Sequence, residues 1–144
     1  MTRDLKNGIT FGAFDLCHVG HIVMLEECKQ YCDYLIVGLH VDPSIERQSK
    51  NKPIQSVYER YVQLRALKFV DEIIPYCHES EIEEMLRTLP IHVRFLGEDY
   101  LHKPYTGQRY CEDNGIQVVY NSRKHSFSST ELRKRISLYS PMPL

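Results

Sequence analysis

The stretch Ile9–His21 reads ITFGAFDLCHVGH and joins a strand-like run to a helix-like one. Ile9 to Phe14 is short, β-branched and aromatic, which predicts a buried strand. From Val19 to Cys32 the apolar residues recur at a helical period. His18 and His21 stand where the helix begins. We therefore expect a strand, a turn and a helix, with both imidazoles at the carboxyl end of the strand.

Outward from this junction, strand-like and helix-like segments alternate to the end of the chain. Apolar runs predict further strands at 34–39, 71–76, 93–96 and 116–120. Helical spacing predicts helices at 56–69, 80–89, 108–113 and 128–136, capped by Ser56, by Ser80 and by Ser128 or Ser129. The alternation predicts an α/β fold. We expect a Rossmann-like, doubly wound sheet of five parallel strands in one domain spanning 1–144.

Three loops with polar or charged side chains follow strands of this predicted sheet. The two histidines follow the first strand, Gly97 to Tyr100 follows the fourth, and Arg123 follows the fifth. Because parallel sheets bind ligands at the carboxyl ends of their strands, we expect these loops to meet at one edge.

Composition excludes several classes of protein. The formal net charge is −1 and 42% of the residues are hydrophobic, so the sequence predicts neither a nucleic-acid-binding nor a membrane protein. Five cysteines without a regular spacing, and no apolar signal-peptide segment after Met1, indicate a cytoplasmic protein with reduced thiols. Cys28 and Cys32 share a predicted helix face with Leu25, so we expect core residues there and no structural zinc.

The two histidines suit an anionic ligand. Placed one turn apart on a helix, both rings can point into one cleft, and Gly20 between them lets a ligand approach the backbone. The helix N-terminus adds unpaired N–H groups and a partial positive charge. Such donors would stabilise the charge of a phosphoryl- or nucleotidyl-transfer transition state. The alternatives are a zinc site shared with nearby cysteines, whose spacing matches no common pattern, and a polar loop without function.

Two groups of cations strengthen the phosphate interpretation. Arg60, Arg65 and Lys68 on the second helix, with Lys50 and Lys52 in the loop before it, can clamp a triphosphate. A solvated basic face is the alternative, and we favour it for Arg65. Arg123 precedes Ser128–Thr130, whose hydroxyls at a helix N-terminus offer a second anion site or a plain cap.

These motifs resemble the cytidylyltransferase branch of the HIGH-motif nucleotidyltransferases. GAFDLCHVGH is similar to its G-x-F-D-x-x-H-x-G-H signature, and Ser128-Ser129-Thr130 after Phe127 is similar to its I-S-S-T element. YERYVQLRALKFVDEIIP resembles its E-R-x-x-x-L…V-D-E-V segment. The motifs run in the same order from about Ile9 to Ile136. Among the small members, those for glycerol 3-phosphate match best in length and in the GEDY stretch.

The resemblance implies an activity and a set of site residues. CTP and a phosphorylated alcohol, with glycerol 3-phosphate expected first, would give a CDP-alcohol and pyrophosphate with Mg²⁺, in a homodimer. His18, His21, Lys50 and Arg123 are the expected catalytic residues. The expected CTP contacts are Phe11, Gly12, Ala13, Phe14, His18, Gly20, His21, Arg60, Gly97, Asp99, Tyr100, Arg123, Ser128, Ser129 and Thr130. Asp42, Lys52 and Lys68 are expected near the acceptor. Mg²⁺ would be held by the CTP phosphates rather than by protein side chains, and Asp15 would position a histidine, a metal-bound water or the loop itself.

The sequence departs from the family pattern at several positions. Ser126 stands for a glycine, Lys68 for an arginine and Tyr100 for a frequent tryptophan, and the segment from Leu101 to Gly107 is long. These departures keep other acceptors open: heptose phosphate, ethanolamine phosphate or a flavin nucleotide. A non-catalytic nucleotide-binding module on the same fold is the rival class.

Overall fold

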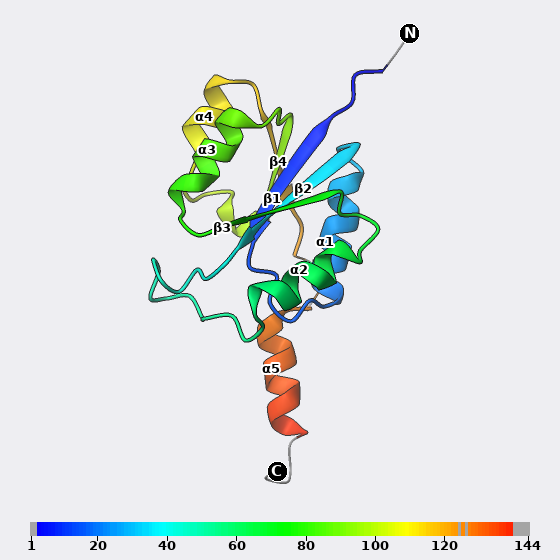
Figure 1. Ribbon diagram of the computed structural model, residues 1–144, viewed down its shortest axis with the longest axis vertical. Helices are drawn as coiled ribbons and strands as arrows, with labels where there is room; N and C mark the ends of the chain where they lie inside the picture. The colour runs from blue at the N-terminus through cyan, green and yellow to red at the C-terminus, as the bar shows by residue number, and fades with distance from the viewer. Residues whose placement is uncertain (1–2, 124, 126, 140–144) are drawn as a thin grey trace.

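A computed structural model describes residues 3–123, 125 and 127–139 (Figure 1). The strands and helices alternate as predicted. In chain order the elements are β1 (Asn7–Gly12), α1 (Val19–Lys29), β2 (Tyr34–His40), α2 (Val57–Arg65), β3 (Glu72–Tyr76), α3 (Ser80–Thr88), β4 (Val93–Gly97), a 3₁₀ turn (Glu98–Tyr100), α4 (Gln108–Asp113), β5 (Gln117–Asn121) and α5 (Ser129–Leu138).

The five strands form one parallel sheet in the order β3-β2-β1-β4-β5. The chain builds outward from β1 to β3, then returns to place β4 on the other side of β1. The strand order therefore reverses beside β1, and this is the point at which such sheets open a crevice for a ligand. The predicted α/β fold with a doubly wound parallel sheet is confirmed.

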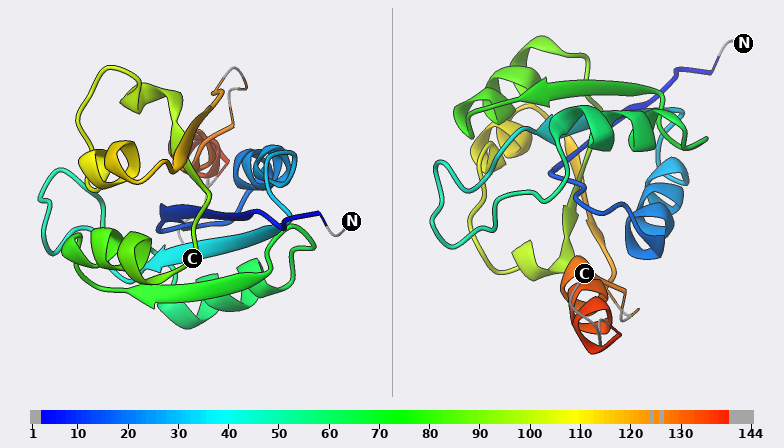
Figure 2. Two further views of the ribbon diagram at one scale, coloured as in Figure 1. Left: turned by 90° about the horizontal axis from the view of Figure 1, so that it is seen from above. Right: turned by 60° about the horizontal axis from the view of Figure 1, so that its bottom comes forward.

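Helices cover both faces of the sheet. Figure 1 shows α1 and α2 on one side of the strands and α3 and α4 on the other, and the views in Figure 2 agree. The α1/α2 face packs Leu25, Cys28 and Leu64 against Leu35, Val37, Leu39, Val93 and Phe95. The α3/α4 face packs Ile82, Met85, Leu86 and Cys111 against Ile9, Ile36 and Tyr76. Successive residues of each strand point to opposite faces, so each strand contributes to both cores.

Two of the three predicted helix caps are present in the structure. Ser56 caps α2 in a capping box with Glu59, and Ser128 caps α5 by accepting a hydrogen bond from the Glu131 amide, as predicted. Ser80 is not a cap, because it is already the first helical residue of α3. The Glu81 carboxylate accepts the amides of the preceding turn instead. A second correction is that α2 ends at Arg65, four residues before the expected end.

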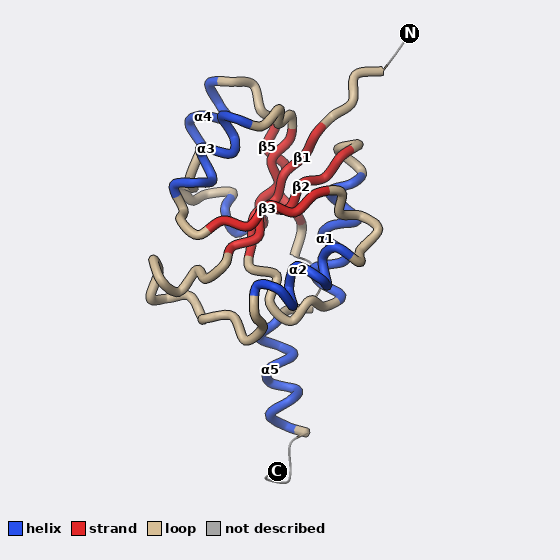
Figure 3. The backbone as a smooth tube through the Cα atoms, in the orientation of Figure 1, coloured by secondary structure: helices blue, strands red, loops and turns tan. Residues whose placement is uncertain are grey.

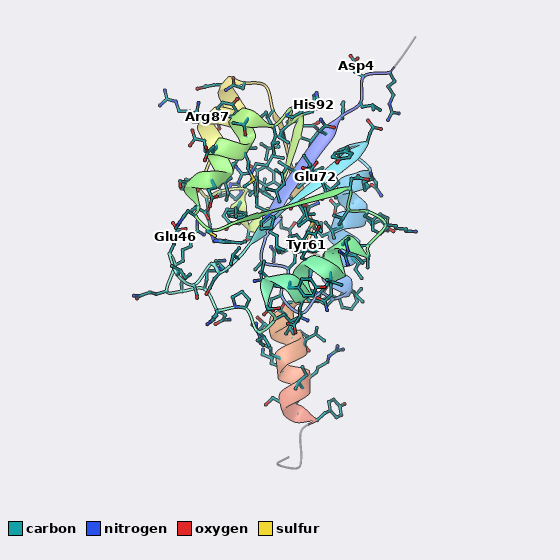
Figure 4. All side chains as sticks on the ribbon, in the orientation of Figure 1. Asp4, Glu46, Tyr61, Glu72, Arg87 and His92 are labelled. Carbon is teal, nitrogen blue, oxygen red and sulfur yellow. The ribbon has the colours of Figure 1, made fainter. Side chains whose placement is uncertain are left out.

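Two segments stand out from the packed body. α5 projects from the carboxyl edge of the sheet in Figure 1 and buries no residue. The long loop between β2 and α2, drawn in tan in Figure 3, runs past the same edge. Its Glu46, labelled in Figure 4, accepts a hydrogen bond from the Glu79 amide just before α3. Within the described residues, no helix has the length and apolar character needed to cross a membrane.

Candidate active site

A cleft of about 840 Å³ opens at the carboxyl edge of the sheet. Loops after β1, β2, β4 and β5 and the first turns of α1 and α5 line it. The predicted site residues that line it are Phe11, Gly12, Ala13, Phe14, Asp15, His18, Gly20, His21, Lys50, Gly97, Asp99, Tyr100, Arg123, Ser128, Ser129 and Thr130. The structure therefore brings the three predicted loops together at one edge.

The two histidines are held in a defined orientation by the start of α1. His18 is the N-cap residue, and its Nδ1 accepts the Gly20 amide at 3.0 Å. His21 Nδ1 accepts the His18 amide at 3.3 Å, which completes a capping box. An imidazole whose Nδ1 accepts must carry its proton on Nε2 when neutral. The backbone thus fixes both tautomers and leaves two Nε2–H donors on neighbouring rings, with centroids 4.0 Å apart.

Both histidines are neutral near pH 7. Burial, together with the positive charges that His18 and Arg123 bring, lowers the pKa of His21 to about 4. Burial and the nearby His125 lower the pKa of His18 as well. Because the charged forms are disfavoured, the pair acts through hydrogen-bond donation rather than as two cations. Phe14, which lies 5.3 Å from His21 between ring centroids, closes the apolar side of the pair.

Gly20 is required by close packing around the histidines. A Cβ atom there would lie 2.8 Å from the His18 ring and 2.9 Å from the carbonyl oxygen of Phe127. Phe127 belongs to the loop after β5, so this loop packs directly against the first turn of α1. A side chain at position 20 would therefore push apart two of the segments that line the cleft.

Arg123 lies across the cleft on the loop after β5. Its Nε is 3.4 Å from Asp99 Oδ1, and its amide donates to Glu98 Oε1 at 3.0 Å. A Cβ at Gly97 would lie 2.7 Å from the Arg123 guanidinium, so the glycine makes room for it. The side chain is mostly exposed, and within the described residues its one ion pair is the long contact with Asp99, so the guanidinium is accessible to phosphate oxygens. Ser126, the family's glycine position, falls outside the described residues.

The N-terminus of α5 is anchored to the loop after β1 through Asp15. Ser129 Oγ donates to the Asp15 carbonyl oxygen at 3.2 Å, and Arg133 donates to Asp15 Oδ2 at 3.1 Å. The first turns of α5 and α1 therefore line the same cleft. Thr130 lines the cleft from the same turn. Two helix N-termini give one cleft two anion-binding ends.

Asp15 is a structural carboxylate. It is 8% exposed, and its two oxygens accept the amides of Ile54 and Gln55 at 2.8 and 3.0 Å in addition to Arg133. These bonds fasten the β2–α2 loop to the loop after β1. Its oxygens are thus committed to the protein, which favours loop orientation over metal coordination. Among the described residues, no three histidine, cysteine or acidic side chains gather in a way that would hold a metal ion.

Arg60 does not take the position expected of a phosphate clamp. It is 2% exposed, and its guanidinium donates to four carbonyl oxygens, those of Ala13, His40, Val41 and Gln55, at 2.6–3.1 Å. These carbonyls come from three separate segments that all meet behind the cleft. Arg60 therefore satisfies buried backbone oxygens and holds the loops after β1 and β2 together.

The other expected cations divide by position. Lys50 lines the cleft from the β2–α2 loop. Lys52 and Lys68 are exposed and lie outside its lining, and Lys68 Nζ lies 5.2 Å from the centre of the Phe69 ring. Asp42 accepts two hydrogen bonds from Ser44 and is likewise outside the lining. The three expected acceptor contacts are thus not brought into the cleft.

The structure adds a second group of cleft residues that sequence reasoning missed. His40, Tyr76, Glu79, Arg94, Tyr105 and Thr106 line its α3/α4 side, and we call this group the arginine arm. His18, His21, Arg123, Ser129 and Thr130 form the histidine arm. One signal was present in the sequence: Arg94 is a lone charge inside the apolar strand VRFLG. The arrangement as a whole suits two phosphorylated ligands held end to end.

Comparisons with known proteins identify the family of the chain. Residues 9–135 match the family model described as Cytidylyltransferase-like. The chain is 33% identical to the glycerol-3-phosphate cytidylyltransferase of Bacillus subtilis over 133 residues, covering 92% of this chain and 98% of that protein. It is 32% identical to the bifunctional protein HldE of Helicobacter hepaticus over 117 residues, covering 78% of this chain and 24% of the relative.

A solved structure shares the fold. The crystal structure of the lipopolysaccharide core biosynthesis protein from Thermoplasma volcanium superposes with a TM-score of 0.65 at 27% identity, covering 83% of this chain and 96% of that one. The chain spans about a quarter of the length of the bifunctional relatives. The segment that matches the family model, residues 9–135, contains the N-termini of α1 and α5 and both histidines. The chain belongs to the cytidylyltransferase-like family of nucleotidyltransferases.

Proposed function

We propose that the protein transfers a cytidylyl group from CTP to a phosphorylated alcohol, giving a CDP-alcohol and pyrophosphate. The observation that carries this proposal is the pair of neutral Nε2–H donors at the start of α1, in one cleft with the N-terminus of α5. An oxygen of the acceptor's phosphate attacks the α-phosphorus of CTP. The bond from that phosphorus to the oxygen bridging to the β-phosphate breaks, and pyrophosphate carries this oxygen away.

The residues of the chain promote this step by position and hydrogen bonding. A phosphate monoester is already a nucleophile near pH 7, so no strong general base is needed. His18 and His21 donate from Nε2 toward oxygens whose negative charge grows in the transition state. The α5 N-terminus, Arg123 and Lys50 hold the β- and γ-phosphates. Neutral imidazoles keep donating at neutral pH without adding a charge that would trap pyrophosphate.

Mg²⁺ belongs to this proposal as an ion held by phosphate oxygens and water. Asp15 is committed to backbone amides and Asp99 lies beside the Arg123 guanidinium, which fits an ion bound through the substrate. When bound, Mg²⁺ neutralises charge on the phosphates of CTP.

Glycerol 3-phosphate is the first acceptor to test, because the Bacillus subtilis relative is named for it and the two proteins match over nearly their full lengths. A sugar phosphate such as heptose phosphate is the second, because the structural relative is a lipopolysaccharide core biosynthesis protein. Ethanolamine phosphate and a flavin nucleotide complete the set of expected acceptors.

The test is pyrophosphate release from CTP with Mg²⁺, measured with each acceptor in turn and with no acceptor. We expect release only when both CTP and one phosphorylated alcohol are present, and a CDP-alcohol in equal amount. ATP and GTP in place of CTP test the base. CTP binding without pyrophosphate release from any acceptor would show the non-catalytic nucleotide-binding module instead.

A homodimer and a cytoplasmic location remain predictions. Sedimentation velocity of the purified chain tests the first, with twice the monomer mass expected. The exposed apolar residues of α5, Ile136 and Leu138 among them, support a contact between subunits.

A further inference from the structure

The arginine arm contains two buried polar atoms without partners. Arg94 is 2% exposed and His40 is 6% exposed. Within the described part of the chain, neither Arg94 Nε nor His40 Nε2 has a hydrogen-bond partner. Both side chains line the cleft. Buried polar atoms in native proteins are nearly always satisfied, so two such atoms in one arm point to a ligand that supplies oxygen atoms.

The sheet register explains how these side chains come together. Alternate residues of each strand face α3 and α4. On this face Tyr76, His40 and Phe11 lie toward the carboxyl ends of their strands, and Arg94 lies near the start of β4, where it pairs with Ile9. His40 stacks on Tyr76 with centroids 4.5 Å apart, and Phe11 meets Tyr76 edge-on at 5.8 Å. Gly38, beside Phe11 in the register, has no side chain that would collide with this ring. The arm is thus a built, rigid surface.

Arg94 gives this surface a positive charge without a matching acid. Its guanidinium lies 5.3 Å from the centre of the Phe11 ring and 5.1 Å from that of Tyr105, and it donates to the Thr106 carbonyl oxygen. No carboxylate among the described residues forms an ion pair with it. Glu79, the nearby acid, accepts instead from Arg47 at 2.8 Å and from Thr106 Oγ1 at 3.1 Å.

The two arms meet at the end of β1. Phe11 packs on Arg94, and Phe14 packs on His21, and only Gly12 and Ala13 separate the two phenylalanines in sequence. An acceptor whose phosphate lies near the histidines therefore extends its other end toward Arg94. A guanidinium offers only donors, which suit hydroxyl oxygens. It also occupies the ring faces of Phe11 and Tyr105 that would otherwise bind an ammonium group.

We propose, on the basis of the transfer reaction above, that Arg94 and His40 bind the hydroxyl end of the acceptor, and that Arg94 selects polyol phosphates over acceptors ending in an ammonium group. Like charges in a partly desolvated site repel strongly, so phosphoethanolamine is rejected while glycerol 3-phosphate is bound. Arg94 acts here as a specificity-determining residue, remote from the reacting phosphorus.

The test compares glycerol 3-phosphate and a sugar phosphate with phosphoethanolamine in the parent and in Arg94→Met. In the parent we expect kcat/KM for the better polyol phosphate to exceed that for phosphoethanolamine by about 100-fold or more. In Arg94→Met this ratio should fall by about tenfold or more, through a higher KM for the polyol phosphate, with KM for CTP unchanged. Arg87→Met is the matched control, because Arg87 also stacks on a ring, that of Tyr110 at 4.8 Å, outside the cleft.

A ratio that is the same in the parent and in Arg94→Met overturns the proposal, as does equal use of phosphoethanolamine by the parent. Equal loss with every acceptor would show that Arg94 only supports the 101–107 loop. Calorimetry measures binding of the same compounds without turnover, so it separates failure of the Arg94 subsite from failure of the transfer reaction. Arg94-dependent binding of a polyol phosphate without pyrophosphate release keeps the subsite and refutes the reaction. If Arg94→Met does not fold, His40→Gln takes its place, and the measurement is again KM for the polyol phosphate.

Discussion

The two arms of the cleft present hydrogen-bond donors in different ways. In the histidine arm the donors are local: capping residues at the first turns of α1 and α5, with the mostly exposed Arg123 beside them. In the arginine arm the donors are buried side chains from strands that are distant in sequence, enclosed by aromatic rings. The first arm suits charge that develops during a reaction, and the second suits the shape and charge of a bound molecule.

The largest effect we expect is on catalysis in the histidine arm. His21→Ala removes a preoriented Nε2–H donor, so kcat should fall by about 10²–10³-fold, or about 3–4 kcal/mol, with a much smaller change in KM for CTP. Steady-state kinetics with varied CTP measure both. His102→Ala, an exposed histidine outside the cleft, is the control. A parent-like kcat with only a raised KM would make His21 a ground-state binder, and the contrast between the arms would disappear.

The next effect concerns Arg60, which joins the two arms from behind. Arg60→Met leaves four carbonyl oxygens without their donors and should lower the free energy of unfolding by about 3 kcal/mol or more. Urea denaturation measures this. Arg65→Met, on the exposed side of the same helix, should change stability by less than about 0.5 kcal/mol. If both variants unfold at the parent's urea concentration, Arg60 does not connect the arms.

The pH dependence of stability compares the arms directly. The pKa of His21 falls from 6.5 to about 4 on folding, so the unfolded chain binds its proton first as the pH drops. The stabilising contribution is present above pH 6.5 and is lost as the pH falls toward 4, for a total of roughly 3 kcal/mol. Urea titrations across this range should show a shallower slope in His21→Ala. Burial also lowers the pKa of His40, so His40→Gln should reduce the slope too.

The smallest effect we expect is at Arg123. A guanidinium beside the phosphates of CTP interacts with charge that is already present in the ground state, so Arg123→Ala should raise KM for CTP about tenfold along with a fall in kcat. Added salt should narrow the difference in KM for CTP between the parent and the variant. Arg109→Ala is the control, since Arg109 is an exposed arginine that also faces an aspartate, on α4 outside the cleft. A kcat effect as large as that of His21→Ala would place Arg123 on the transition state.

The histidine arm was predictable from the sequence because its chemistry is local. Capping residues, a glycine between two histidines and serines before a helix all lie within a few positions of one another, and these patterns determine local geometry. The strands and their parallel order followed from hydrophobic runs and alternation. What the pattern left open was the proton position, which depends on the amides that His18 and His21 accept.

The arginine arm and Arg60 were not predictable in the same way. Arg60 was assigned to a phosphate because it is one of several cations on and before the predicted second helix and lies in the segment that resembles E-R-x-x-x-L. Its actual partners lie 47 residues before it and 19–20 residues before it, and only the folded sheet brings them together. Arg94 on β4 and His40 on β2 lie on the same face of the sheet because of the register of β2 and β4 with β1 between them. Sequence spacing carries no information about such contacts.

The weak attachment of α5 has a consequence for its dynamics. Within the described residues the helix buries none of its side chains and is fastened to the body through Ser129 and Arg133 on Asp15, so we expect its backbone amides to open at a cost below that of unfolding the sheet. A nucleotide held at its first turn would add its binding free energy to that local opening. Hydrogen–deuterium exchange in α5 would then slow in proportion to occupancy while exchange in β1 stayed constant, and the helix would report on the cleft without any label.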